Sequence, residues 1–185
     1  MTNGDGALDQ TACENLIHIL RSATNDSWSS FCGIEVPPPE TYEGTEAQRD
    51  WMSLILIVGK DVRISHASFF AGKELKRVQE HFGMASHAFG HAHVMKEFSN
   101  CVAGKIKTIL SSFEIDTEIS LPLGTIAIND LVFFRGTEVT TNFWLSKLPD
   151  GNVVHQTKHH IRNADKLREA HYSPSVDESS SISFL

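Results

Sequence analysis

The sequence predicts an α+β domain in which two long helices pack on an antiparallel sheet. Apolar residues recur with helical period near residues 12–22 and 93–113, and short apolar strands separated by turn residues fill much of the rest. A third observation is an order of elements that occurs twice: a helix, a strand containing proline, then a hairpin. This helix–strand–hairpin pseudo-repeat lacks residue identity and is a hint about architecture. Many strands with few helices favour helices gathered on one face of the sheet.

The composition is that of an ordinary globular protein, and its charge and hydrophobic pattern argue against nucleic acids and membranes as partners. Hydrophobic residues make up 41% and charged residues 21% of the 185 residues, enough for one domain with a sizeable core. The net charge is −7 and no basic block occurs, which argues against a nucleic-acid partner. The longest central apolar run, residues 54–58, is too short to span a bilayer, so we expect no membrane partner.

Cysteine usage and the N-terminus predict a cytoplasmic protein. Cys13, Cys32 and Cys101 are few and widely spaced, which suits a reducing compartment and offers neither a disulfide framework nor a zinc motif. The first ten residues are polar, without the apolar core of a secretory signal. We expect a flexible N-terminus over residues 1–10, one domain over 11–165 and a polar, disordered tail over 166–185.

The first elements are expected to be a helix, a loop and an edge strand. Residues 12–22 show an apolar face, with Thr11 as the N-cap. Residues 24–30 are polar and predict a loop. Residues 31–42 alternate apolar and polar side chains and then contain three consecutive prolines, which predicts an edge strand that continues as an extended segment.

A hairpin and a short helix should follow. Residues 51–58 and 62–70 are rich in apolar residues and flank the turn Gly59-Lys60-Asp61. Residues 73–82 have the pattern of an amphipathic helix, which Gly83 would end.

The long helix predicted over residues 93–113 has two different faces. When the residues are placed around the helix at about 100° per residue, the apolar side chains gather on one stripe, which we expect to face the core. The opposite side gathers polar or small residues, among which Glu97 and Asn100 stand side by side. Asn is a poor helix former and Gly104 should cost about 0.8–1 kcal/mol relative to Ala, so this face is unusual for plain solvated surface. A carboxylate, a carboxamide and a gap at glycine have the appearance of a docking surface, but the helical pattern alone is equally that of tolerated exposed residues.

The last part of the domain predicts three strands. Residues 119–128 contain Leu121-Pro122-Leu123-Gly124 and predict a strand interrupted by an irregular segment. Residues 132–145 and 153–161 should pair across the turn Asp150-Gly151.

The long helix carries a motif that resembles the CheC/CheX/FliY family of chemotaxis phosphatases. The family signature is Asp or Ser, three residues, Glu, two residues, Asn, and a proline about 23 positions later. Glu97 and Asn100 match, Pro122 falls 22 positions after Asn100 (122 − 100), and His93 replaces the Asp or Ser. A single Glu-x-x-Asn on a long helix is most similar to the CheX-like branch.

The resemblance implies a hydrolase acting on the phosphoaspartate of a response-regulator receiver domain in chemotaxis or two-component signalling. It implies that Asn100 orients the attacking water and that Glu97 pairs with a lysine of the receiver. His93, Gly104 and Pro122 would contact the partner. The chain would bind no cofactor, because the Mg²⁺ belongs to the CheY-like receiver. Analogy to CheX-like proteins also suggests a homodimer.

Other interpretations remain open. The replacement at His93 and the shifted proline favour a non-catalytic module that docks a receiver or a motility component; the histidine is also a candidate cause of docking that changes with pH. A divalent-metal site is allowed by the spacing of His87, His91 and His93 with Glu97. The simpler interpretation is that these histidines are exposed surface residues. Ser99 lies near histidines, but no triad or oxyanion loop accompanies it.

Overall fold

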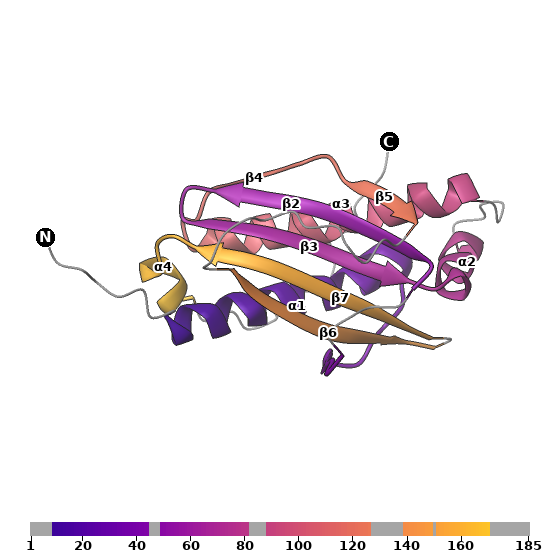
Figure 1. The fold of residues 1–185 in the computed structure, drawn as a ribbon, viewed down its shortest axis with the longest axis horizontal. Helices are drawn as coiled ribbons and strands as arrows, with labels where there is room; N and C mark the ends of the chain where they lie inside the picture. Colours follow the sequence, from indigo (N-terminus) through magenta and orange to yellow (C-terminus); the bar gives the residue numbers. More distant parts are fainter. Residues whose placement is uncertain (1–8, 45–48, 82–87, 127–138, 150, 171–185) are drawn as a thin grey trace, which may run out of the picture.

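The protein folds around one antiparallel sheet with its two long helices on the same side (Figure 1). The computed structural model describes residues 9–44, 49–81, 88–126, 139–149 and 151–170. The sheet has seven strands in the order β1-β6-β7-β3-β2-β4, and β5 pairs with β2 beside β4. The predicted α+β class with an antiparallel sheet is therefore confirmed. The strands are β1 (Glu40–Thr41), β2 (Trp51–Gly59), β3 (Val62–Phe70), β4 (Thr117–Ile119), β5 (Leu123–Ile126), β6 (Thr140–Leu148) and β7 (Gly151–Ile161).

The helices are α1 (Gln10–Cys32), α2 (Gly72–His81), α3 (Ala88–Ser112) and α4 (Asp165–Arg168). The predicted pseudo-repeat is visible in their order: α1, β1 and the β2–β3 hairpin are followed, after α2, by α3, the β4 and β5 pieces and the β6–β7 hairpin. The short strands exchange partners, since β1 pairs with β6 while β4 and β5 pair with β2. The two hairpins are joined directly by the pairing of β3 with β7, and the exchanged short strands add further links between the two halves of the sheet.

The first helix is about twice as long as predicted, so the polar loop expected at residues 24–30 is wrong. The edge strand expected over residues 31–42 is observed only as β1, at the edge of the sheet. The hydroxyls of Thr24 and Ser27 each donate to a carbonyl one turn earlier at 2.7 Å, so these residues satisfy themselves within the helix. Trp28 and Phe31 are buried against α3. The helix ends at Gly33, which has a φ of 62° and donates to Ser29 O at 2.8 Å.

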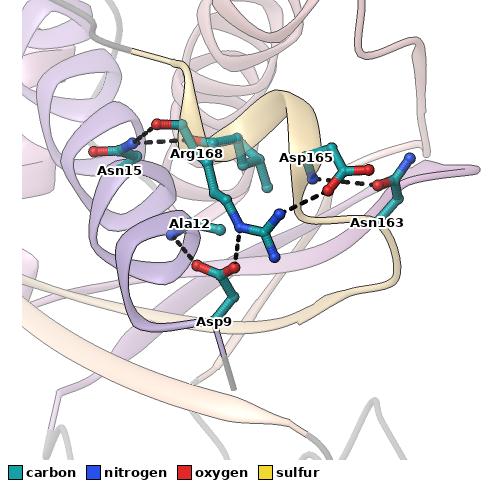
Figure 2. A network of polar contacts seen from close by, with 7 residues as sticks. Asp9, Ala12, Asn15, Asn163, Asp165 and Arg168 are labelled. Carbon is teal, nitrogen blue, oxygen red and sulfur yellow. Dashed lines mark hydrogen bonds and ion pairs between the residues drawn. The ribbon is translucent and has the colours of Figure 1, made fainter. Parts of the chain in front are cut away.

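The N-cap of α1 is Asp9, not Thr11, and it is tied to the other end of the domain (Figure 2). The Asp9 carboxylate accepts from the Ala12 amide at 3.0 Å and pairs with the Arg168 guanidinium. These two contacts, the amide first, lower the pKa of the carboxyl. The Asn15 amide donates to the carbonyls of Leu167 and Arg168, so α4 packs on the first turns of α1.

Leu167 shows that the packed part of the chain extends past the expected boundary at residue 165. Its side chain is fully buried in the main core, and Ala170 is buried beside it. We therefore expect Leu167→Ala to cost about 2–5 kcal/mol of unfolding free energy, as truncation of a buried leucine does. Urea denaturation measures this, with Glu169→Ala, at a neighbouring exposed position, as the control. A change below about 0.5 kcal/mol would mean that α4 is not part of the cooperative unit.

The remaining elements follow the sequence closely. The predicted hairpin is observed as β2 and β3, and the predicted short helix as α2. Residues 127–138, which include the start of the strand expected at 132–145, lie outside the described residues; its later part is β6. The interrupted strand expected over residues 119–128 is observed as β4 and β5 as far as residue 126.

Candidate functional site

The polar face of α3 is the candidate site, and the helix is fixed by its opposite face. Val94, Phe98, Val102 and Ile106 of the predicted apolar stripe are buried in the core between α1 and the sheet. Cys101 is half-buried, and its thiol lies 3.8 Å from the Ser30 hydroxyl of α1. These buried side chains therefore fix how α3 lies on the sheet. The candidate residues lie between them in the sequence and on the opposite side of the helix.

The candidate residues point away from this core and share one side of the helix. His93 and Asn100 are exposed, while Glu97 and Gly104 are half-buried. Successive members are three or four residues apart, the spacing of neighbours on a helix surface. Within the described part of the chain, the side chains of His93, Glu97 and Asn100 form no hydrogen bond or ion pair. An acid and an amide thus point outward side by side, and neither bonds to another described residue.

The turn that carries Glu97 and Asn100 is anchored directly beneath them. The Phe98 ring lies 4.1 Å, centroid to centroid, from the Trp28 ring of α1. The Ser99 hydroxyl donates to the Ser53 hydroxyl of β2 at 2.8 Å, and both residues are fully buried. Ser99 is therefore a structural residue rather than a nucleophile, and the bonds of this turn hold the two candidate side chains outward.

Gly104 leaves open space one turn beyond Asn100. A Cβ built on this glycine meets no atom within 4 Å. We expect Gly104→Ala to raise the free energy of unfolding by up to about 1 kcal/mol, because alanine is the better helix former and nothing obstructs its methyl group. Urea denaturation measures the gain, and Gly124→Ala is the contrasting control, since its Cβ would meet Ala92 O at 3.0 Å. Destabilisation by Gly104→Ala would show that the space is not free.

Pro122 lies in the break between β4 and β5, next to this helix. Glu118, just before the break, pairs with Lys107 at 3.5 Å. Gly124, just after it, packs against the backbone of Ala92 and the side chain of Lys96. Residues 119–123 therefore run along the flank of α3, and the structure brings Pro122 to the same region as Glu97 and Asn100.

The alternative of a metal site has little support in the residues that can be placed. His87 lies outside the described residues, and His91 packs edge-on against Trp51 with ring centroids 5.2 Å apart. His93 is exposed. Within the described ranges, no three His, Cys, Asp or Glu side chains gather as metal ligands.

Sequence reasoning missed a polar network inside the domain, beneath the helices. The Ser68 hydroxyl lies 2.9 Å from His155 Nδ1 and 3.2 Å from His66 Nε2, and His155 Nε2 lies 3.1 Å from Ser146 Oγ. All four residues are buried, and the two imidazole rings stack with centroids 5.6 Å apart. The signal in the sequence was the alternation of side chains along each strand, which places these residues on the face of the sheet that is covered by the helices.

Burial lowers the pKa of each histidine in this region. The pKa of His66 falls to about 3, and that of His155 lies well below its ordinary value because of burial and, secondarily, His66. His159, whose Nε2 lies 3.3 Å from Cys13 Sγ, has its pKa lowered by burial to about 4. These imidazoles are therefore neutral in the folded protein at pH 7. They support the sheet beneath α1 and α3, not the exposed site.

Comparison with known proteins gives a result at the level of structure alone. Neither a scan of protein-family models nor a search of curated proteins finds a match. No described helix is long and apolar enough to cross a membrane.

Several solved structures share the fold. A CheC-like superfamily protein from Shewanella has a TM-score of 0.66 at 14% identity, covering 79% of this chain and 97% of that one. CheX from Vibrio vulnificus has a TM-score of 0.64 at 17% identity, covering 78% and 99%. The CheX–CheY–BeF3–Mg complex from Borrelia burgdorferi has a TM-score of 0.61 at 18% identity, covering 80% and 98%. The resemblance predicted from the Glu97 and Asn100 motif is thus confirmed in its architecture, and the chain has the fold of the CheX and CheC-like chemotaxis proteins.

Proposed function

We propose that this protein is a CheX-like phosphatase that hydrolyses the phosphoaspartate of a CheY-like receiver domain. Asn100 orients the attacking water and Glu97 pairs with a lysine of the receiver. The observation that carries the proposal is the pair of outward side chains on one turn of α3, which is anchored by the Ser99–Ser53 hydrogen bond; neither side chain bonds to any other described residue. The fold shared with CheX proteins, one of them in complex with CheY, BeF3 and Mg, supports this choice of partner.

The chemistry requires little from the protein beyond placement. Water attacks the phosphorus of the acyl phosphate, a new P–O bond forms, and the bond to the aspartate oxygen breaks to release carboxylate and inorganic phosphate. Orientation of the water in line with the leaving group supplies much of the rate gain. The Asn100 amide suits this task, because its NH₂ can donate to the phosphoryl oxygens while its carbonyl accepts from the water.

Glu97 suits the second task, because a carboxylate on the same face can hold a cation at the rim and fix the orientation of the complex. The same charge at position 100 would repel the phosphoryl oxygens. The Mg²⁺ required by the phosphoaspartate would be bound by the receiver. A homodimer, expected by analogy, is part of this proposal and is measured by sedimentation.

A direct assay tests the function. Receiver domains of the source organism are purified, phosphorylated with acetyl phosphate in Mg²⁺, separated from the donor, and followed for phosphate release with and without this protein. We expect release from at least one receiver to accelerate in proportion to the protein added. Unaltered release from every receiver would contradict the phosphatase proposal.

A second function is favoured by one observation. His93 stands exposed where the family motif has Asp or Ser, at the end of the same polar row. A module that binds the phosphorylated receiver without hydrolysing it would keep the docking face and lose the turnover. Binding without acceleration in the same experiment would select this alternative.

A further inference from the structure

The large apolar side chains exposed on the described part of the protein all lie along one edge of the sheet. They are Val58 of β2, Leu121 in the break between β4 and β5, and Leu123 and Ile126 of β5. Leu121 is 92% exposed, far more than Leu123 at 43%. A leucine that stands almost completely in water beside a proposed docking helix suggests a contact made only in a complex.

Two contacts place Leu121 level with Asn100 along the helix. Glu118 pairs with Lys107, and Gly124 packs against Ala92. Along the edge strand, Leu121 is midway between Glu118 and Gly124, three residues from each (121 − 118 and 124 − 121). Along the helix, Asn100 is midway between Lys107 and Ala92, seven residues from the first and eight from the second (107 − 100 and 100 − 92). Since the strand rises about 3.3 Å and the helix 1.5 Å per residue, the two midpoints lie opposite each other.

The side chain of Asn100 also points toward the flank where Leu121 lies. Lys96, whose stem packs beside Gly124, and Lys107 are eleven residues apart, close to three full helical turns, and so mark the side of α3 that faces β4 and β5. At about 100° per residue, Asn100 lies roughly 40° from Lys96, toward solvent. The amide and the exposed leucine therefore border the same surface.

A change of strand register explains why Leu121 projects. Ile119 pairs with Ile57, and Leu123 pairs with Leu54, so four steps along the edge strand (123 − 119) match three steps along β2 (57 − 54). The extra residue is a β-bulge, a feature that redirects side chains and often occurs next to functional sites. Leu56 accepts from and donates to Ser120 within the bulge, which holds it in place.

We propose that Leu121 is the apolar anchor of the docking surface, inserted against the receiver domain when Asn100 enters its phosphorylation site. This inference rests on the proposed function. The receiver is the occupant that fits, because Leu121 continues the surface formed by Asn100 and Glu97. Leu121 is then a binding residue with no part in the chemistry, and it determines which receiver surface can approach Asn100.

The test separates affinity from turnover in Leu121→Ser. Phosphate release is measured over a range of phosphorylated receiver concentrations, and binding is measured separately by titration calorimetry with the receiver loaded with BeF3⁻ and Mg²⁺. We expect the half-saturating concentration and the Kd to rise at least about tenfold, since burial of a leucine is lost. The maximal rate should stay within about twofold of the wild type, because Asn100 is untouched.

Leu123→Ser is the matched control, since this leucine pairs with Leu54 and belongs to the sheet face opposite to the helices. Its Kd should stay at the wild-type value, and unchanged affinity in Leu121→Ser would overturn the proposal. Sedimentation velocity adds a further outcome: if Leu121→Ser dissociates a dimer and leaves receiver affinity intact, the edge binds a second copy and the proposal is wrong. If the wild type binds the receiver without hydrolysing it, the phosphatase proposal fails, while the calorimetric comparison still decides the role of Leu121.

Discussion

Asn100→Ala is expected to lower the accelerated rate of receiver dephosphorylation by about 100-fold or more while leaving the protein folded. Removal of one preorganised polar group that acts in the transition state typically costs 10²–10³ in rate. The side chain is exposed and bonds to no other described residue, so its truncation leaves the core intact. Single-turnover phosphate release at saturating protein measures the effect, and the urea midpoint checks the fold.

Two further exchanges distinguish orientation of water from simple contact. Asn100→Asp has nearly the same shape but brings negative charge to the phosphoryl oxygens, and we expect it to be as inactive as the alanine variant. Glu97→Gln should mainly raise the half-saturating receiver concentration, because its proposed role is to hold the complex. Turnover within about twofold of wild type in Asn100→Ala would show that another group positions the water.

Acidification is expected to destabilise the protein steeply below about pH 6.5 through three buried histidines. His66, His155 and His159 have folded-state pKa values lowered by burial, to about 3 for His66 and about 4 for His159. In the unfolded chain each titrates near 6.5. The unfolded state therefore binds more protons as the pH falls, and stability that is complete above pH 6.5 is lost progressively toward pH 4.

This loss of stability on acidification is large enough to determine the pH range in which the protein stays folded. At pH 5 His66 and His159 each cost about 2 kcal/mol, and His155 adds to this loss in the same direction, against the about 5–15 kcal/mol that stabilises a typical domain. Urea unfolding at half-unit pH steps gives the slope, which we expect to include about two protons from His66 and His159, with His155 acting in the same direction. His159→Gln should reduce the slope by about one proton, whereas His93→Gln, at an exposed site, is the control. Stability that is constant from pH 7 to 5 would show that these imidazoles reach solvent in the native state.

The elements with strong periodic signals were predictable from the sequence. The β2–β3 hairpin is rich in apolar residues and flanks a short turn, and its observed bounds differ from the expected ones by at most one residue. The motif helix α3 begins earlier than residue 93, but its inward and outward faces follow the 100° rule. Helical periodicity alone was therefore enough to predict that Glu97 and Asn100 lie on the outward face of α3.

The second half of α1 could not be recognised from local propensity. Residues 24–30 are rich in Ser, Asn and Asp, which favour turns in isolation. In the fold, Trp28 packs on Phe98 and the serine and threonine hydroxyls bond within the helix, so tertiary burial overrides the local preference. Gly33 was the overlooked signal, because glycine just beyond an apolar pair is a common helix terminator.

The exposed leucine at 121 was equally hidden, because the bulge that projects it arises from pairing with β2. The sequence showed an irregular Pro-Gly segment, but the one-residue change of register exists only in the assembled sheet. Likewise, the network around His66 and His155 required knowledge of which strands lie side by side.

The packing of Trp28 on Phe98 has a consequence for the thermodynamics of association. Because Phe98 and Ser99 are held against α1 and the sheet in the free protein, the backbone of this turn has little conformational freedom to lose when a partner binds. The entropic penalty on this side of the complex would then come mainly from ordering the exposed side chains, such as that of Asn100.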